Sequence, residues 1–518
     1  MIAAAAARIV GTATVAAVAL LLLTGCGGPR RPSLAAQRLV ADGLIAEGCY
    51  RCLDEAVGRY SSMPPARPAE ARVNDTQLFR ALVLLALREK ELGLDAAPHV
   101  KRAALLVPQT TAPAAAREQL KWAELVPANA AGLPRDVAEH ERARLVPLGS
   151  ELQQRFADAA TMTDPLDVYL NVSLACSPIF QLKLPDPEVV AAPAAAHPIV
   201  QWRVAICGRT HEDALRAFAE RHPRYVEADY WRGRYRLASG GGSGTSIREA
   251  RERMQTALKD IPGSLAIAYD LAGVTRVTSP RHALPLYERV TRAQPRHNDA
   301  WLGLGICLTY LERPREAIDA LTKVIDLGRW VVGDAYYWRA WNRHVLGELD
   351  AAWADSDGAR KTIYNTDVLT LAGRIAFDQK ALDTARPLLE KAFELSDTNC
   401  VAAWYLGLAH STQERWTAGG DTFVHAETCY RAEIDRIRAE QQRAAATEVE
   451  ETIRAERQAK ADAAILVAER QAALSAYNAA FNFVRGGDLA RSRPLLDRAV
   501  QHADVSDRAR ELRAFVDR

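Results

Sequence analysis

Apolar and small residues recur along residues 264–430 with a nearly constant long period. Within each period they stand three or four residues apart on two successive segments, which is the spacing of one face of an α-helix. Successive periods place Ile267, Trp301, Tyr336, Leu369 and Ala403 at equivalent positions, with separations of 34, 35, 33 and 34 residues. The pattern predicts consecutive pairs of helices. A single pair cannot bury its apolar face alone, so the pairs must stack on one another.

These periods resemble the tetratricopeptide repeat (TPR), a 34-residue helix–turn–helix unit. Gly305, Gly373 and Gly407 fall where the first helix of such a repeat crosses the second, and a small residue there lets the two helices approach closely. Arg343 and Ser356 depart from the pattern in the third period, which predicts looser packing there. The resemblance implies an all-α solenoid with a groove for a protein or peptide.

The regular array is flanked by less regular helical sequence. Residues 41–210 predict an N-terminal domain of divergent TPR-like hairpins, and residues 211–430 the TPR array. Residues 431–470, rich in Arg, Glu, Gln and Ala and without Gly or Pro, predict a long charged helical hairpin insertion. Its charged face is either simply solvated or an arm that binds a partner. Residues 471–518 predict a last repeat and a capping helix.

The N-terminus has the pattern of an export signal. The apolar run Ile9–Leu23 is shorter than the roughly 20 residues that a membrane-spanning helix needs. It is typical of the hydrophobic region of a signal peptide. The sequence Leu23-Thr24-Gly25-Cys26 at its end resembles the lipobox of bacterial lipoproteins.

The lipobox resemblance implies that residues 1–25 are a lipoprotein signal peptide and that Cys26 is lipidated. Residues 26–40 then form the lipidated end and its tether. Gly27, where Asp would favour retention in the inner membrane, favours the outer membrane, at its periplasmic or surface face. The alternative is an ordinary secretory peptide with a chance Cys.

Seven cysteines remain once Cys26 is assigned to lipid, so at least one has no partner within the chain. Export permits disulfides. Cys400 and Cys429 stand near the start and the end of one antiparallel helix pair, which predicts a disulfide between them, and Cys176 with Cys207 is a second candidate.

No pattern of residues indicates catalysis. The chain contains no HExxH sequence, and its Gly-rich segment near residue 240 lacks the Lys of a phosphate-binding loop. Cys49 and Cys52 lack the second CxxC of a tetrahedral zinc site. The net charge of +2 gives no indication of the basic patch that binding of nucleic acid requires. We therefore expect no enzyme, no cofactor, no metal and no nucleic-acid partner.

The TPR resemblance also implies which side chains line the groove, because the first helix of each repeat faces it. Aromatic residues and Arg are enriched at binding hot spots. The alternative for each residue is packing between helices. The predicted partner-binding residues are Tyr310, Tyr337, Trp341, His344, Arg374 and Trp404, with Arg276, Ile306 and Phe377 nearby.

Together these patterns predict a lipid-anchored scaffold that binds a protein or peptide of the bacterial cell envelope. The alternative is a glycan- or solute-binding lipoprotein similar to the SusD family, which also places TPR-like helices behind a lipid anchor. Against that alternative, the regular repeat continues into the last fifty or so residues of this chain.

Overall fold

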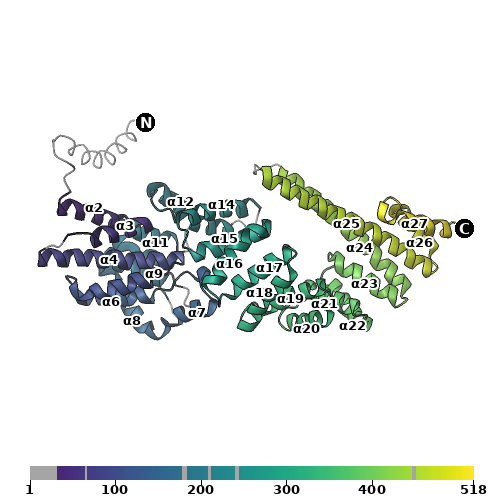
Figure 1. The fold of residues 1–518 in the computed structure, drawn as a ribbon, viewed down its shortest axis with the longest axis horizontal. Coiled ribbons are helices and arrows are strands. Elements are labelled where there is room, and N and C mark those ends of the chain that lie inside the picture. Colours follow the sequence, from purple (N-terminus) through teal and green to yellow (C-terminus); the bar gives the residue numbers. More distant parts are fainter. Residues whose placement is uncertain (1–31, 65–66, 178–183, 208–211, 240–243, 446–450) are drawn as a thin grey trace. The chain divides into compact units, whose positions relative to one another are not determined.

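The computed structural model describes residues 32–64, 67–177, 184–207, 212–239, 244–445 and 451–518, and every regular element within these ranges is a helix (Figure 1). The predicted all-α class is confirmed for this part of the chain. None of the helices described is both long enough and apolar enough to cross a membrane. The predicted signal peptide and Cys26 lie outside the described residues.

The chain forms two compact units, of which unit 1 comprises residues up to 129 and 138–264. Apolar side chains from nearly all of its helices meet in one continuous core, in which Trp122, Trp202 and Tyr169 are almost completely buried. Its helices are α2 (Leu34–Glu47), α3 (Tyr50–Ser61), α4 (Pro68–Leu92), α5 (Ala97–Leu106), α6 (Pro113–Leu125), α7 (Arg135–Ala143, which unit 2 shares), α8 (Gly149–Ala157), α9 (Pro165–Ala175), α10 (Pro187–Ala191), α11 (Pro198–Ala205), α12 (Glu212–Arg221), α13 (Ala228–Ser239) and α14 (Gly244–Asp260).

A charged network lies inside the core of unit 1. The guanidinium of Arg88 is fully buried and pairs with the carboxylates of Glu91 and Glu227. It also lies over the ring of Trp202, with Cζ 4.4 Å from the ring centroid. Burial by itself lowers the pKa of Arg88, but the two carboxylates outweigh it and hold the pKa above its ordinary value. Arg88 therefore stays charged.

The two carboxylates are held from other helices as well. Trp202 Nε1 donates to Glu91 over 3.1 Å, and the Tyr169 hydroxyl donates to the same carboxylate. The backbone N–H of Tyr50 donates to Glu227 over 3.0 Å. The network thus ties α3, α4, α9 and α11 to the segment that precedes α13.

Unit 2 comprises residues 130–137 and 265–518. Its helices follow one another as antiparallel pairs, and the first helix of each pair also contacts the first helix of the next. This contact pattern defines a layer of first helices, as in a TPR-like solenoid. The pairs are α15 (Leu265–Thr278) with α16 (Pro280–Ala293), α17 (Asn298–Tyr310) with α18 (Pro314–Leu327), α19 (Val332–Val345) with α20 (Leu349–Arg360), α21 (Thr366–Asp378) with α22 (Leu382–Leu395), and α23 (Cys400–Thr412) with α24 (Trp416–Ala445).

Glycine is required where the helices of a pair cross. A Cβ added to Gly305 would lie 2.6 Å from Leu321 Cγ, and one added to Gly373 would lie 2.6 Å from Leu389 Cγ. Both distances are shorter than any ordinary carbon–carbon contact, which lies near 3.5–4.0 Å. The close approach of the paired helices, inferred from the small residues of the repeat, is confirmed at these crossings.

In the third pair, ion pairs between α19 and α20 take the place of some of the apolar contacts. Asp355 is almost buried and accepts hydrogen bonds from Arg339, at 2.7 and 2.8 Å, and from Arg343, at 2.9 Å. The two arginines lie one helical turn apart on α19, and Asp355 lies on α20. Arg343, which departs from the repeat pattern, is thus held by an ion pair between the helices.

Helices α24 and α25 (Glu451–Arg485) are long and pack against each other, and the hairpin predicted for residues 431–470 falls within them. About midway along both helices, they pack on the array through a small core that includes Tyr430, Ile434 and Ala468. Beyond that core, residues 435–445 and 451–467 form what we call the arm. Gln441 donates to Asp462 across it over 2.9 Å. The C-terminal part of α25 pairs with α26 (Leu489–Ala499), and α27 (Ala503–Val516) packs on both.

The boundaries of the predicted domains stay predictions. The compact units divide after Ser264, so α12, α13 and α14 of the predicted array belong to unit 1.

Candidate interaction groove

The layer of first helices in unit 2 contains a hollow that three successive pairs build. Its volume is about 550 Å³, within the usual range of ligand pockets. Because α15, α17 and α19 lie side by side, one side chain or more from each reaches the same space. The lining consists of Arg276, Val277, Pro280, Leu302, Ile306, Tyr310, Asp334 and Trp338, together with Lys460 of the arm.

Two aromatic rings dominate the hollow. Tyr310, at the end of α17, is 57% exposed despite its size. Its ring meets that of Trp338 on α19 edge to face, with centroids 5.7 Å apart. Trp338 in turn meets Tyr337 in the same way at 5.3 Å. The contacts hold Trp338 in place and leave Tyr310 open to a partner.

A second group of rings continues along the first helices. Arg374 on α21 lies between two rings, with Cζ 5.5 Å from the centroid of Trp341 and 5.4 Å from that of Tyr405. Burial raises the pKa of Tyr405, and the nearby Arg374 opposes that rise. Cation–π contacts of this kind fix the arginine between neighbouring pairs.

Of the six predicted partner-binding residues, Tyr310 lines the hollow. Tyr337 and Trp341 are partly buried against the core of the third and fourth pairs, and burial raises the pKa of Tyr337 to about 12. His344 Nε2 lies 2.6 Å from a carboxylate oxygen of Asp378. Trp404 packs edge to face against Phe423 at 5.3 Å. Tyr337, Trp341, His344 and Trp404 thus have packing or ion-pair partners inside the array, and their role in partner binding stays a prediction.

Sequence reasoning missed Asp334 and Trp338. They lie one helical turn apart on α19, on the side next to Tyr310. The repeat positions instead indicated Tyr337 and Trp341, which are also one turn apart, so the predicted set and the lining of the hollow differ by a rotation of one residue around the helix. The spacing of the aromatics alone could not distinguish the two registers.

The cysteines form the pairs that their spacing predicts. Cys400 and Cys429 have Cα atoms 5.4 Å apart, and so do Cys176 and Cys207. Both distances suit a disulfide. Cys49 and Cys52 are joined as well, so the nearby Glu47 has no thiolate beside it with which to hold a metal. Cys307 is buried, which raises its pKa to about 12 and keeps it unreactive.

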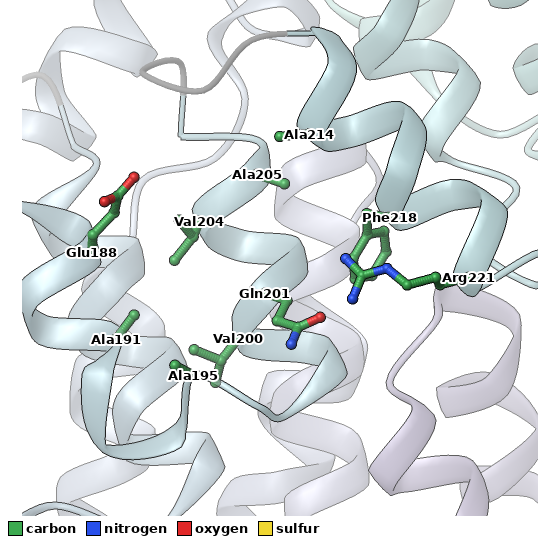
Figure 2. A pocket seen from close by; sticks show the side chains of 10 residues that line it. All are labelled: Glu188, Ala191, Ala195, Val200, Gln201, Val204, Ala205, Ala214, Phe218 and Arg221. Carbon is green, nitrogen blue, oxygen red and sulfur yellow. The ribbon is translucent and has the colours of Figure 1, made fainter. Parts of the chain in front are cut away.

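Unit 1 has a smaller hollow of its own, between α10, α11 and α12. Figure 2 shows Val200, Gln201 and Val204 along α11, with Phe218 and Arg221 opposite them on α12. Its volume of about 240 Å³ is below the usual 300–1,000 Å³ or so of ligand pockets. The hollow of unit 2 is therefore the stronger candidate.

The chain matches no family model and no curated protein. Solved structures are similar to it at low identity. YrrB, described as a TPR protein with an unusual peptide-binding site, is 14% identical to this chain. The match covers 43% of this chain and 97% of the YrrB chain, with a TM-score of 0.32. A TPR protein from Parabacteroides merdae is 16% identical over 44% of this chain and 87% of its own, with a TM-score of 0.34.

One chain in the structure of the APC/C hetero-tetramer Cut9–Hcn1 is similar over 93% of this chain and 96% of that one, at 12% identity and a TM-score of 0.32. At TM-scores this low, none of these likenesses adds to what the stacked helix pairs themselves show. The class is that of an all-α solenoid with TPR-like helix pairs.

Proposed function

We propose that this protein is a membrane-anchored, non-catalytic scaffold that binds a protein or peptide partner in the bacterial cell envelope. The observation that carries the binding role is the hollow across α15, α17 and α19, with Tyr310 exposed at its edge. An exposed aromatic next to a concave surface is a common feature of protein interfaces. The lipobox resemblance of residues 23–26 supports the anchor, and Gly27 supports the outer-membrane setting.

The shape of the hollow favours a polypeptide over a glycan. Tyr310 and Trp338 stand edge to face, so they do not offer the pair of flat parallel rings on which a sugar would stack. The lining mixes apolar side chains with the charges of Arg276 and Asp334. A peptide can supply both apolar contacts and charge.

Replacing Tyr310 with Ala is expected to weaken partner binding about 30-fold, the effect of a hot spot worth about 2 kcal/mol. The partner is first recovered by crosslinking in intact cells, and its affinity for purified protein is then measured by calorimetry. Tyr364→Ala is the matched control, because Tyr364 is 64% exposed and lies outside the hollow. Equal losses in both variants, or a melting temperature that glycans raise while no protein is recovered, would contradict the scaffold role.

Replacing Cys26 with Ser is expected to abolish lipid attachment and to move the protein out of the membrane fraction. Two or more acyl chains anchor a protein stably, whereas a protein without them has no such affinity. The measurements are labelling with an alkyne fatty acid and fractionation of the envelope. Cys307→Ala serves as the control, since that thiol is buried in α17. Lipid label that persists in the Cys26 variant would refute the anchor.

A further inference from the structure

The arm returns to the hollow of the array. Lys460, on α25, lines the same space as Ile306, Tyr310 and Trp338, although the base of the arm packs on α23. The hollow therefore has a floor made by the first helices and a further wall made by the arm. The contact of the arm with the hollow favours a binding role for the arm over a charged face that is merely solvated.

On the C-terminal side of Lys460, the face of α25 that carries this lysine is small and apolar. Ala463, Ala464 and Val467 follow Lys460 at spacings of three, four and seven residues, so all four share one side of the helix. Ala463 and Ala464 are exposed and Val467 is 60% exposed. Exposed apolar side chains next to a concave surface mark an interaction site when they are contiguous.

The charges around the hollow are not neutralised. Within the described part of the chain, Arg276 and Lys460 have no carboxylate within ion-pair distance, and the carboxylate of Asp334 has no cation. The buried Nε of Arg276 also has no hydrogen-bond partner there. Two cations face one carboxylate, so the space favours a ligand with negative charge.

From this geometry we propose that the arm is the second jaw of a clamp. It holds an apolar segment of a partner protein against Ile306, Tyr310 and Trp338, and an acidic side chain of that segment pairs with Arg276 and Lys460. The proposal deepens the proposed function and rests on it, because it adds the arm and the chemistry of the partner to the same hollow. The charged hairpin thereby acquires a role in binding.

The first experiment finds a defined probe for the clamp. A phage library of random dodecapeptides is selected on the full-length protein, and the enriched sequences are compared with those from a support without protein. We expect enrichment of peptides with Asp or Glu among apolar residues. Enrichment of basic peptides would overturn the clamp, and no enrichment at all would count against both the clamp and peptide binding in the groove.

The second experiment measures the affinity of the most enriched peptide by fluorescence anisotropy. Lys460→Glu is expected to weaken binding at least tenfold, because a charge-assisted hydrogen bond is lost and a like charge replaces it. The matched control, Arg443→Glu, changes a residue that lies on the arm but does not line the hollow, and should change the affinity less than twofold. Exchanging the acidic residue of the peptide for Lys should restore binding to Lys460→Glu, which a merely structural role of Lys460 would not do.

A shortened arm separates the clamp from the groove. Residues 442–461 are replaced by a Gly-Ser loop, which leaves Gln441 opposite Asp462 and preserves the small core at the base of the arm. Circular dichroism checks that the variant melts as the parent does. If Tyr310→Ala loses binding while the short-arm and Lys460 variants keep it, the clamp is wrong and the proposed function stands. If all three bind as the parent does, the clamp is wrong and the hollow is not the binding site of the proposed function.

Discussion

Replacing Arg88 with Met is expected to lower the free energy of unfolding of unit 1 by about 3–5 kcal/mol, which is a large fraction of the stability of an ordinary domain. Methionine fills much of the same volume, so the loss is mainly electrostatic. Glu91 and Glu227 would remain buried without the cation that both contact. Uncompensated buried charge is costly because the interior cannot replace the water that the carboxylates give up.

Urea unfolding followed by circular dichroism measures this loss. Arg51→Met is the matched control in the same unit, because Arg51 pairs with Asp260 at 2.9 Å while half exposed. An exposed pair of this kind contributes at most about 1 kcal/mol. The triple variant Arg88→Met, Glu91→Leu and Glu227→Leu should recover part of the loss, since it removes Arg88 together with both of its carboxylate partners. A loss for Arg88→Met no larger than that for Arg51→Met would show that the network is not essential to the core.

Removing the disulfide between Cys400 and Cys429 is expected to lower the stability of the C-terminal helix pairs by about 2–4 kcal/mol. The bond closes a loop with a sequence separation of 29 residues and joins α23 to α24. Without the disulfide, the unfolded chain has a higher conformational entropy, because the loop is no longer closed. In a stacked array the effect should be local, because each pair contacts chiefly its neighbours.

Two measurements test this expectation. Peptide mapping of the non-reduced protein should recover Cys400 linked to Cys429, and the double variant to Ser should melt at a lower temperature than the parent. Cys307→Ala leaves every pairing intact and is the control for loss of a cysteine. Free thiols at both Cys400 and Cys429 would contradict the pairing, and a melting temperature equal to that of the parent would contradict its effect on stability.

Much of the array could be predicted because its information is local. The separations of Ile267, Trp301 and Tyr336 give the length of each helix pair, and helical spacing within a pair depends only on neighbours along the chain. Glycine at the crossings marks where two helices must nearly touch, which Gly305 and Gly373 show. The length of helices α24 and α25 likewise agrees with a composition that contains no helix breaker.

The hollow could be predicted only in part. Its helices follow from the repeat, but its lining depends on the rotation of α19 about its axis, and a rotation by one residue exchanges Tyr337 for Trp338. That rotation is set by contacts with neighbouring pairs. Asp355, for example, engages both Arg339 and Arg343 on α19. No local pattern around residue 338 records those contacts.

The sequence by itself determined the helical class, the repeat length and the places where helices cross, because these follow from short-range periodicity and side-chain size. Tertiary structure alone decided the charged core of unit 1, where Arg88 meets Glu227, which is far away along the chain. It also brought Lys460 beside Tyr310 and Trp338. Contacts between distant segments depend on how whole helices stack. The local sequence around a charged residue does not show whether its side chain lies in solvent, in a core or beside a groove.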